Sequence, residues 1–196
     1  MPVSIGASEN TFANPIGLLS DCHRRIERFL QILLTVAAQA EGGALDAEHR
    51  RALEAGLQYF REAAPKHIAD EEEDLFPRLR QLRGARIPVL TDIDRLEAEH
   101  KTAEAWHCQV NQLGERWLRE NFLGMEDTAH LKNLLTSLSA MYRTHISLEE
   151  NRVFPAARRE LPEAELQAIG RRMAVRRGVL FAPDMAVLSH LERRKL

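Results

Sequence analysis

Four histidines of this chain are each followed, four residues later, by a glutamate, and no other feature of the sequence constrains the fold as strongly. The pairs are His23/Glu27, His67/Glu71, His100/Glu104 and His145/Glu149. Four residues make one helical turn plus about 40°, so both side chains of a pair lie on one face of a helix. One such pair is usually a surface ion pair worth a few tenths of a kcal/mol. Four pairs indicate helices that present imidazole and carboxylate groups to a metal ion.

The last two pairs repeat the first two. His100 follows His23 by 77 residues, and His145 follows His67 by 78. The segments HIADEEEDLFP, from His67, and HISLEENRVFP, from His145, share six of eleven residues. Long-period repeats usually indicate a solenoid or a propeller, but two copies are too few for either. We infer an internal duplication folded about a pseudo-two-fold axis, with two metal ions related by that axis.

Apolar residues recur at spacings of three and four, and the period-two alternation of strands is missing. We expect a first helix from an Asn14 cap to Gly42–Gly43 and a second from an Asp46 cap, kinked at Pro65. A third should be capped by Thr91 or Asp92 after a connection at 84–88, and a fourth should follow Gly124. A short fifth helix should run from Leu161–Pro162 to near Gly178, with a tail over 179–196.

These elements predict an all-α fold, an antiparallel four-helix up-down bundle with a short extra C-terminal helix. The expected organisation is an N-terminal arm over 1–14, a metal-binding bundle over 15–160, and a C-terminal helix and tail over 161–196. Phe76–Pro77 and Phe154–Pro155 are expected to end the inner helical segments and to fill the core at one end.

Composition excludes several classes of protein. The net charge is −2 with 29% charged residues, so no overall attraction to nucleic acid or anionic membranes is expected. The sequence shows no run of eighteen apolar residues and no signal-peptide pattern at its start, which predicts a cytoplasmic location. The two cysteines, Cys22 and Cys108, cannot form a disulfide framework, and Cys22 is interpreted as a core thiol.

The histidines continue the apolar stripes of their helices, so the neighbouring glutamates would be buried with them. Burying an unpaired carboxylate costs several kcal/mol, and a pair of dications would compensate that cost. Imidazole with carboxylate suits iron, manganese or zinc. The predicted metal ligands are His23, His67, Glu71, His100, Glu104, His145 and Glu149.

Symmetry suggests how these ligands divide between two ions. His23 and His67 would bind one ion, His100 and His145 the other, and Glu71 and Glu149 would bridge them. Glu27 and Glu104 are either further ligands or acceptors that orient imidazole N–H groups. Glu72 and Glu150, which recur in both halves, are interpreted as solvated or as orienting groups.

This ordered set of motifs resembles the hemerythrin-like, or HHE cation-binding, family of four-helix bundles over about residues 15–160. The resemblance implies a non-haem centre of two oxo- or hydroxo-bridged iron ions with an open position for dioxygen or a related small ligand. Two departures count against reversible oxygen carriage. Glu104 stands where hemerythrins proper have a histidine, and Glu149 follows His145 by four residues rather than five.

Three functions remain open at this point. The first is a di-iron protein that binds or senses dioxygen, nitric oxide or peroxide, or handles iron. The second is a di-iron redox enzyme consuming peroxide or dioxygen, with Glu104 or Glu27 as proton shuttle. The third is a regulatory domain whose folding depends on iron supply. The basic segment 171–177 is interpreted as a solvated face packed beside the bundle rather than as a partner-binding helix.

Overall fold

The computed structural model describes residues 10–82 and 87–179, and every regular element in those ranges is a helix. Four rods form the body of the molecule. The first is α1 (Pro15–Ala40) and the third is α5 (Ile87–Glu120). The second comprises α2 (Ala47–Glu62), α3 (Ala64–Ala69), the π-helical segment η1 (Asp70–Leu75) and α4 (Phe76–Gln81). The fourth comprises α6 (Met125–Leu148), the π-helical segment η2 (Glu149–Val153) and α7 (Phe154–Glu160), and α8 (Glu163–Arg176) follows it.

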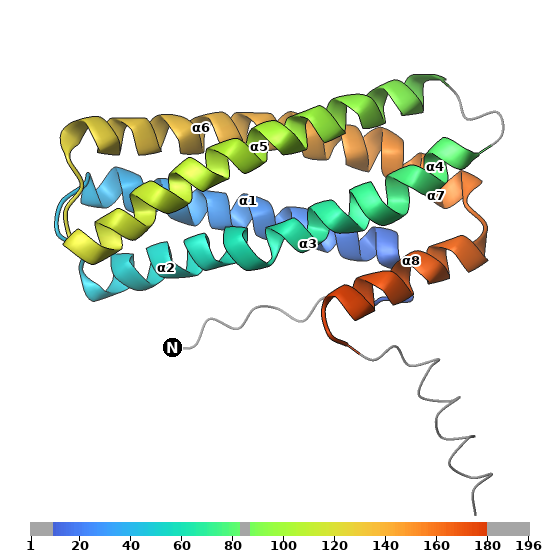
Figure 1. Cartoon of the computed structure of the whole chain (residues 1–196), viewed down its shortest axis with the longest axis horizontal. Helices are drawn as coiled ribbons and strands as arrows, with labels where there is room; N and C mark the ends of the chain where they lie inside the picture. Colours follow the sequence, from blue (N-terminus) through green and yellow to red (C-terminus); the bar gives the residue numbers. More distant parts are fainter. Residues whose placement is uncertain (1–9, 83–86, 180–196) are drawn as a thin grey trace, which may run out of the picture.

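Each rod contacts two others, in the cyclic order α1, α2, α5, α6. The α1–α2 and α5–α6 turns lie at one end of the molecule, and α4 and α7 lie at the other, so consecutive rods run in opposite directions (Figure 1). The all-α prediction is confirmed, and α8 is the expected extra helix. Most of the predicted arm and tail, residues 1–9 and 180–196, lies outside the described ranges, as do residues 84–86 of the predicted connection. Within the described ranges no helix is long and apolar enough to cross a membrane.

Two of the helix starts follow the predicted caps. The Asn14 side chain accepts a hydrogen bond from the Gly17 N–H at 3.1 Å, and Pro15 opens α1. Asp46 accepts from the N–H groups at the start of α2 at 2.9 and 2.8 Å. The predicted cap at Thr91 or Asp92 is wrong, because α5 begins about one turn earlier, at Ile87. The following residue is a proline, which a first helical turn tolerates because that N–H has no helical partner there.

The two π-helical segments were not predicted. The Phe76 N–H bonds to the Glu71 carbonyl, and the Phe154 N–H bonds to the Glu149 carbonyl, both five residues back. A proline follows each phenylalanine, and in an α-helix its ring would clash with the carbonyl four residues earlier. The wider π turn relieves that clash, so the rods continue as α4 and α7. The expectation that these Phe-Pro pairs end the helical segments was therefore wrong, although both phenylalanines are fully buried.

Two apolar clusters fill the bundle, one on each side of a polar layer. On α1, His23 lies between Leu19 of one cluster and Ile26 of the other. On α5, His100 lies in the same way between Leu96 and Ala103. The histidines thus interrupt the core at one level of the bundle.

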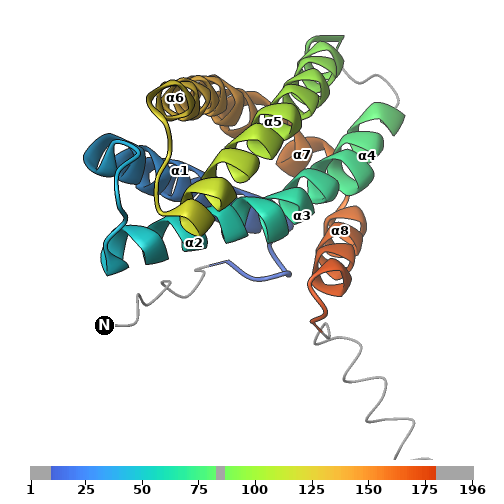
Figure 2. The same ribbon diagram turned by 60° about the vertical axis from the view of Figure 1, so that its left-hand side comes forward.

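Helix α8 packs against α1 and η1 at the end of the bundle that carries α4 and α7 (Figure 2). Arg177 donates to both Asp70 carboxylate oxygens, at 3.2 and 2.5 Å. Arg176 donates to Asp74 at 2.9 Å and also contacts Asp70. Arg172 also pairs with Asp74. Both aspartates are fully buried, so this basic segment packs beside the bundle through ion pairs rather than as a merely solvated face.

Candidate metal centre

Six of the predicted ligands meet in the polar layer, and all four rods contribute. The histidines come from α1, α3, α5 and α6, and the two glutamates stand next to each other in space at η1 and η2. Each of the six residues is at most 4% exposed. These six residues are His23, His67, Glu71, His100, His145 and Glu149.

On one side of the layer, His23 and His67 face an oxygen from each carboxylate. The His67 Nε2 atom lies 3.4 Å from Glu71 Oε1, and the His23 Nε2 atom lies 3.0 Å from Glu149 Oε2. Glu71 Oε1 is also 3.9 Å from His23 Nε2. One donor atom from each of these four residues falls within 4.8 Å of all the others, which is the size of a single ion site.

On the other side, His100 and His145 face the remaining two carboxylate oxygens. The His145 Nε2 atom is 3.5 Å from Glu149 Oε1, and the His100 Nε2 atom is 3.6 Å from Glu71 Oε2. The two Nε2 atoms lie 3.1 Å apart. Each carboxylate therefore directs one oxygen to each pair of histidines, which is the arrangement expected of bridging ligands.

The cluster fits metal ions in two respects. Both oxygens of Glu71, both oxygens of Glu149 and the His23 Nε2 atom are buried without a hydrogen-bond partner among the described residues. Buried polar atoms nearly always have a hydrogen-bond partner, so five such atoms without one at the same place indicate a cation site. In addition, two nitrogens that each bind one ion at about 2.1 Å must lie within about 4.2 Å of each other. The His100 and His145 Nε2 atoms, 3.1 Å apart, meet that condition.

Two further glutamates orient imidazoles across the duplication. Glu150 lies 3.0 Å from His23 Nδ1, and Glu72 lies 2.8 Å from His100 Nδ1. Each half of the chain thus supplies the carboxylate behind a histidine of the other half. Of the two interpretations of this glutamate pair, the orienting one agrees with these contacts.

Glu99 was not singled out from the sequence. It lies 2.9 Å from His145 Nδ1 and is also bonded to Arg95. The residue precedes His100, so its side chain points from α5 towards α6 rather than into the cluster. Its place in the duplication offered no signal, because the corresponding residue of the first half is Cys22.

Glu27 and Glu104 are exposed and lie outside the cluster. Their spacing from a histidine is the same as that of Glu71 and Glu149, but α1 and α5 run opposite to the rods that carry those residues (Figure 1). One turn beyond the histidine on α1 or α5 therefore leads away from the bridging carboxylates. Glu104 instead lines a cavity beside the cluster.

Burial and the neighbouring charges together set the protonation of the cluster. Burial raises the pKa of Glu71 to about 8, and the nearby charge of Glu149 adds to that rise. Burial acts in the same direction on the pKa of Glu149, but the nearby imidazoles of His145 and His23 bring it below its usual value. Burial also lowers the pKa of His67 well below its usual range. Protons and metal ions therefore compete for the same buried atoms.

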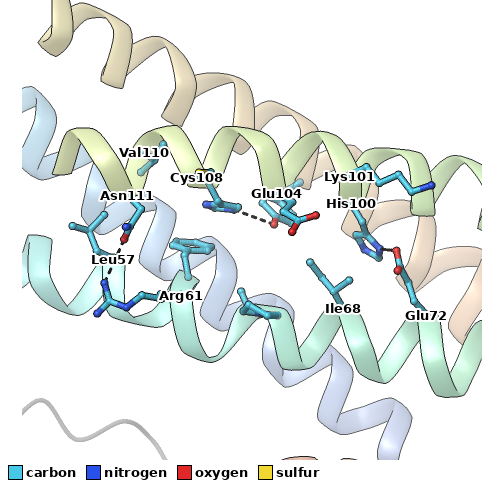
Figure 3. Close-up of a pocket in the computed structure, with 15 residues that line it drawn as sticks. Leu57, Arg61, Ile68, Glu72, His100, Lys101, Glu104, Cys108, Val110 and Asn111 are labelled. Atoms are coloured by element: carbon cyan, nitrogen blue, oxygen red, sulfur yellow. Dashed lines mark hydrogen bonds and ion pairs between the residues drawn. The ribbon is translucent and has the colours of Figure 1, made fainter. Parts of the chain in front are cut away.

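A cavity of about 390 Å³ lies between α2–α3 and α5 and reaches the flank of His100 (Figure 3). Pro65, at the break between α2 and α3, lines it together with apolar side chains. The lining also includes the exposed charged residues Arg61, Lys101 and Glu104. The apolar lining residues are Leu57, Phe60, Ala64, Ile68 and Val110.

Comparisons with known proteins agree with this geometry. The family model described as the hemerythrin HHE cation-binding domain matches residues 14–157. The chain is also 32% identical over 170 residues to an uncharacterized protein of Haemophilus influenzae, a match that covers 86% of this chain and 93% of that one. The chain therefore belongs to the hemerythrin HHE cation-binding domain family.

Proposed function

We propose that this protein holds two iron ions in the buried cluster and uses them to bind or sense dioxygen, nitric oxide or peroxide, or to handle iron. One observation carries the proposal: two buried carboxylates each direct one oxygen to each of two histidine pairs. His23 and His67 would hold one ion, and His100 and His145 the other. Glu71 and Glu149 would bridge them.

The donor set favours iron over softer metals. Nitrogen and oxygen donors suit iron, manganese or zinc, and the cluster contains no thiolate ligand. Each ion would have four protein donors, two imidazoles and one oxygen from each carboxylate, which leaves room for a small ligand. When bound, the ions would supply redox chemistry and a binding position for that ligand.

The chain's own residues would prepare the centre in three ways. Glu72, Glu99 and Glu150 accept from imidazole Nδ1–H groups, which fixes the rings and makes the Nε2 atoms better donors. The two apolar clusters exclude bulk water from the layer. The cavity beside His100 would admit a small apolar ligand such as dioxygen or nitric oxide.

The test is metal content together with an optical spectrum of protein purified without oxygen. We expect about two irons per chain and a spectral change when dioxygen or nitric oxide is added. Reversal of that change on removing the ligand would support binding, and its persistence would support redox chemistry. A folded helical protein that takes up neither iron nor any other divalent ion would contradict the proposal.

A second prediction concerns the cavity. Changing Ala64 to Phe should fill part of the cavity that reaches His100, because Ala64 is buried and lines that cavity. Nitric oxide should then associate at least about tenfold more slowly, which corresponds to an activation barrier raised by about 1.4 kcal/mol, with metal content unchanged. Stopped-flow mixing of the iron-loaded protein measures the rate. The matched control is Ala55→Phe on the exposed face of α2, which should leave the rate as it is.

A further inference from the structure

The four imidazoles of the cluster differ in whether their Nδ1 atom has a hydrogen-bond acceptor. The Nδ1 atoms of three histidines have a glutamate oxygen within 3.0 Å. The Nδ1 atom of His67 is buried and has no hydrogen-bond partner among the described residues. His67 is thus the one member of the set whose ring no acceptor orients.

The internal duplication explains the missing acceptor. The glutamate behind His145 is Glu99, which directly precedes His100. The corresponding position in the first half directly precedes His23, and there the chain has Cys22. Cys22 is buried. A thiol is only a weak acceptor, so it cannot replace a carboxylate.

An acceptor behind a metal-binding imidazole fixes the tautomer and orientation of the ring and raises its basicity. Removal of such a group typically lowers metal affinity by 10- to 100-fold. The two ion positions offer the same kinds of donor, two imidazoles and one oxygen from each bridging carboxylate. They differ in how closely Glu71 approaches, because it belongs to the tight donor group of His23 and His67 but not to that of His100 and His145. His145 has an acceptor at its Nδ1 atom and His67 has none, and this difference is therefore expected to make the metal affinities of the two positions unequal.

Resting on the proposed function, we propose that the two metal positions are unequal and that Cys22 and Glu99 set the difference. The position at His100 and His145 fills first and retains its ion. The position at His23 and His67 binds about 10- to 100-fold more weakly and exchanges its ion. The cavity opens beside His100, so the retained ion is also the one that a small ligand reaches first.

The experiment titrates metal-free full-length protein with ferrous iron under anaerobic conditions, and separately with cobalt(II), in calorimetry against a competing chelator. The wild type should bind two ions in two resolved steps. His67→Ala should retain the tight step, and His145→Ala should lose it. Circular dichroism checks that each variant is folded.

The decisive variant is Glu99→Cys, which gives the second half the residue of the first. Glu99 is partly exposed, so the change creates no large buried cavity. Its tight step should weaken by about 10- to 100-fold and approach the other step. Glu99 also pairs with Arg95 at 2.7 Å. Arg95→Ala is therefore the matched control, because it removes that ion pair and should leave both steps unchanged. Cys22→Glu should act in the opposite direction and tighten the weak step.

The outcomes separate this inference from the function on which it rests. Two ions bound with equal affinity by the wild type would overturn the inference and leave the di-metal centre in place. Equal weakening of both steps by Glu99→Cys would overturn it as well. A wild type that binds neither ion would instead overturn the proposed function.

Discussion

A chain in which Glu71 and Glu149 are both changed to Gln is expected to lose both metal ions. Each carboxylate offers one oxygen to each histidine pair, so the double change removes two of the four donors at both positions. Metal content measured after loading and desalting should fall from about two ions per chain to nearly none. Amides are also poor bridges, because they carry no negative charge to offset that of two dications.

The same variant should lose the stabilisation that metal gives the wild type. A ligand present at about 1,000 times its dissociation constant stabilises the folded state by about 4 kcal/mol per site. For a chain of this size, that corresponds to a rise in Tm of roughly 8–16 °C for each ion. Thermal unfolding with and without metal measures the effect, and the Gln variant should show almost none.

The chain provides its own control for this experiment. Glu27→Gln combined with Glu104→Gln changes two glutamates that also follow a histidine by four residues but are exposed and outside the cluster. This variant should keep both ions and the full stabilisation. If it loses as much metal as the first variant, the ligand assignment derived from the structure is wrong.

Changing both Arg176 and Arg177 to Ala is expected to lower the free energy of unfolding by about 3–5 kcal/mol. The reason is that Asp70 is fully buried and loses both arginines that pair with it, which leaves an uncompensated buried charge. Asp74 keeps its ion pair with Arg172. The Tm should fall by roughly 6–20 °C. Urea unfolding followed by circular dichroism gives the free energy, measured on metal-free protein so that metal binding does not contribute.

Two variants test whether unpaired charge is the cause. Arg171→Ala removes an arginine from the same helix that makes no ion pair with Asp70 or Asp74 among the described residues, and it should change the stability by less than about 0.5 kcal/mol. Adding Asp70→Asn to the double arginine variant should restore part of the loss, because it removes the buried charge that has lost its partners. A double arginine variant as stable as the wild type would show that α8 does not depend on these pairs.

Much of the fold could be predicted because its signals are local. Asn14 and Asp46 cap their helices as expected, since capping depends only on neighbouring residues. The break before His67 follows from Pro65. The duplicated motif also indicated the family, which the family model confirms over residues 14–157.

The sequence alone determined which residue types would meet, because four His–Glu pairs repeated at 77 and 78 residues place imidazole and carboxylate on the buried faces of helices. Only the tertiary structure decided which of the four His–Glu pairs contribute both the histidine and the glutamate to the cluster. Glu71 and Glu104 have the same spacing from a histidine, but their rods run in opposite directions, so one is buried in the cluster and the other is exposed. Tertiary structure also decided two contacts between distant segments. Glu99 reaches His145 from a neighbouring rod, and the two arginines at the C-terminal end of α8 reach Asp70 across 106 and 107 residues. Helical periodicity fixes the face on which a side chain lies, whereas the direction and neighbours of each helix depend on packing between segments far apart in the chain.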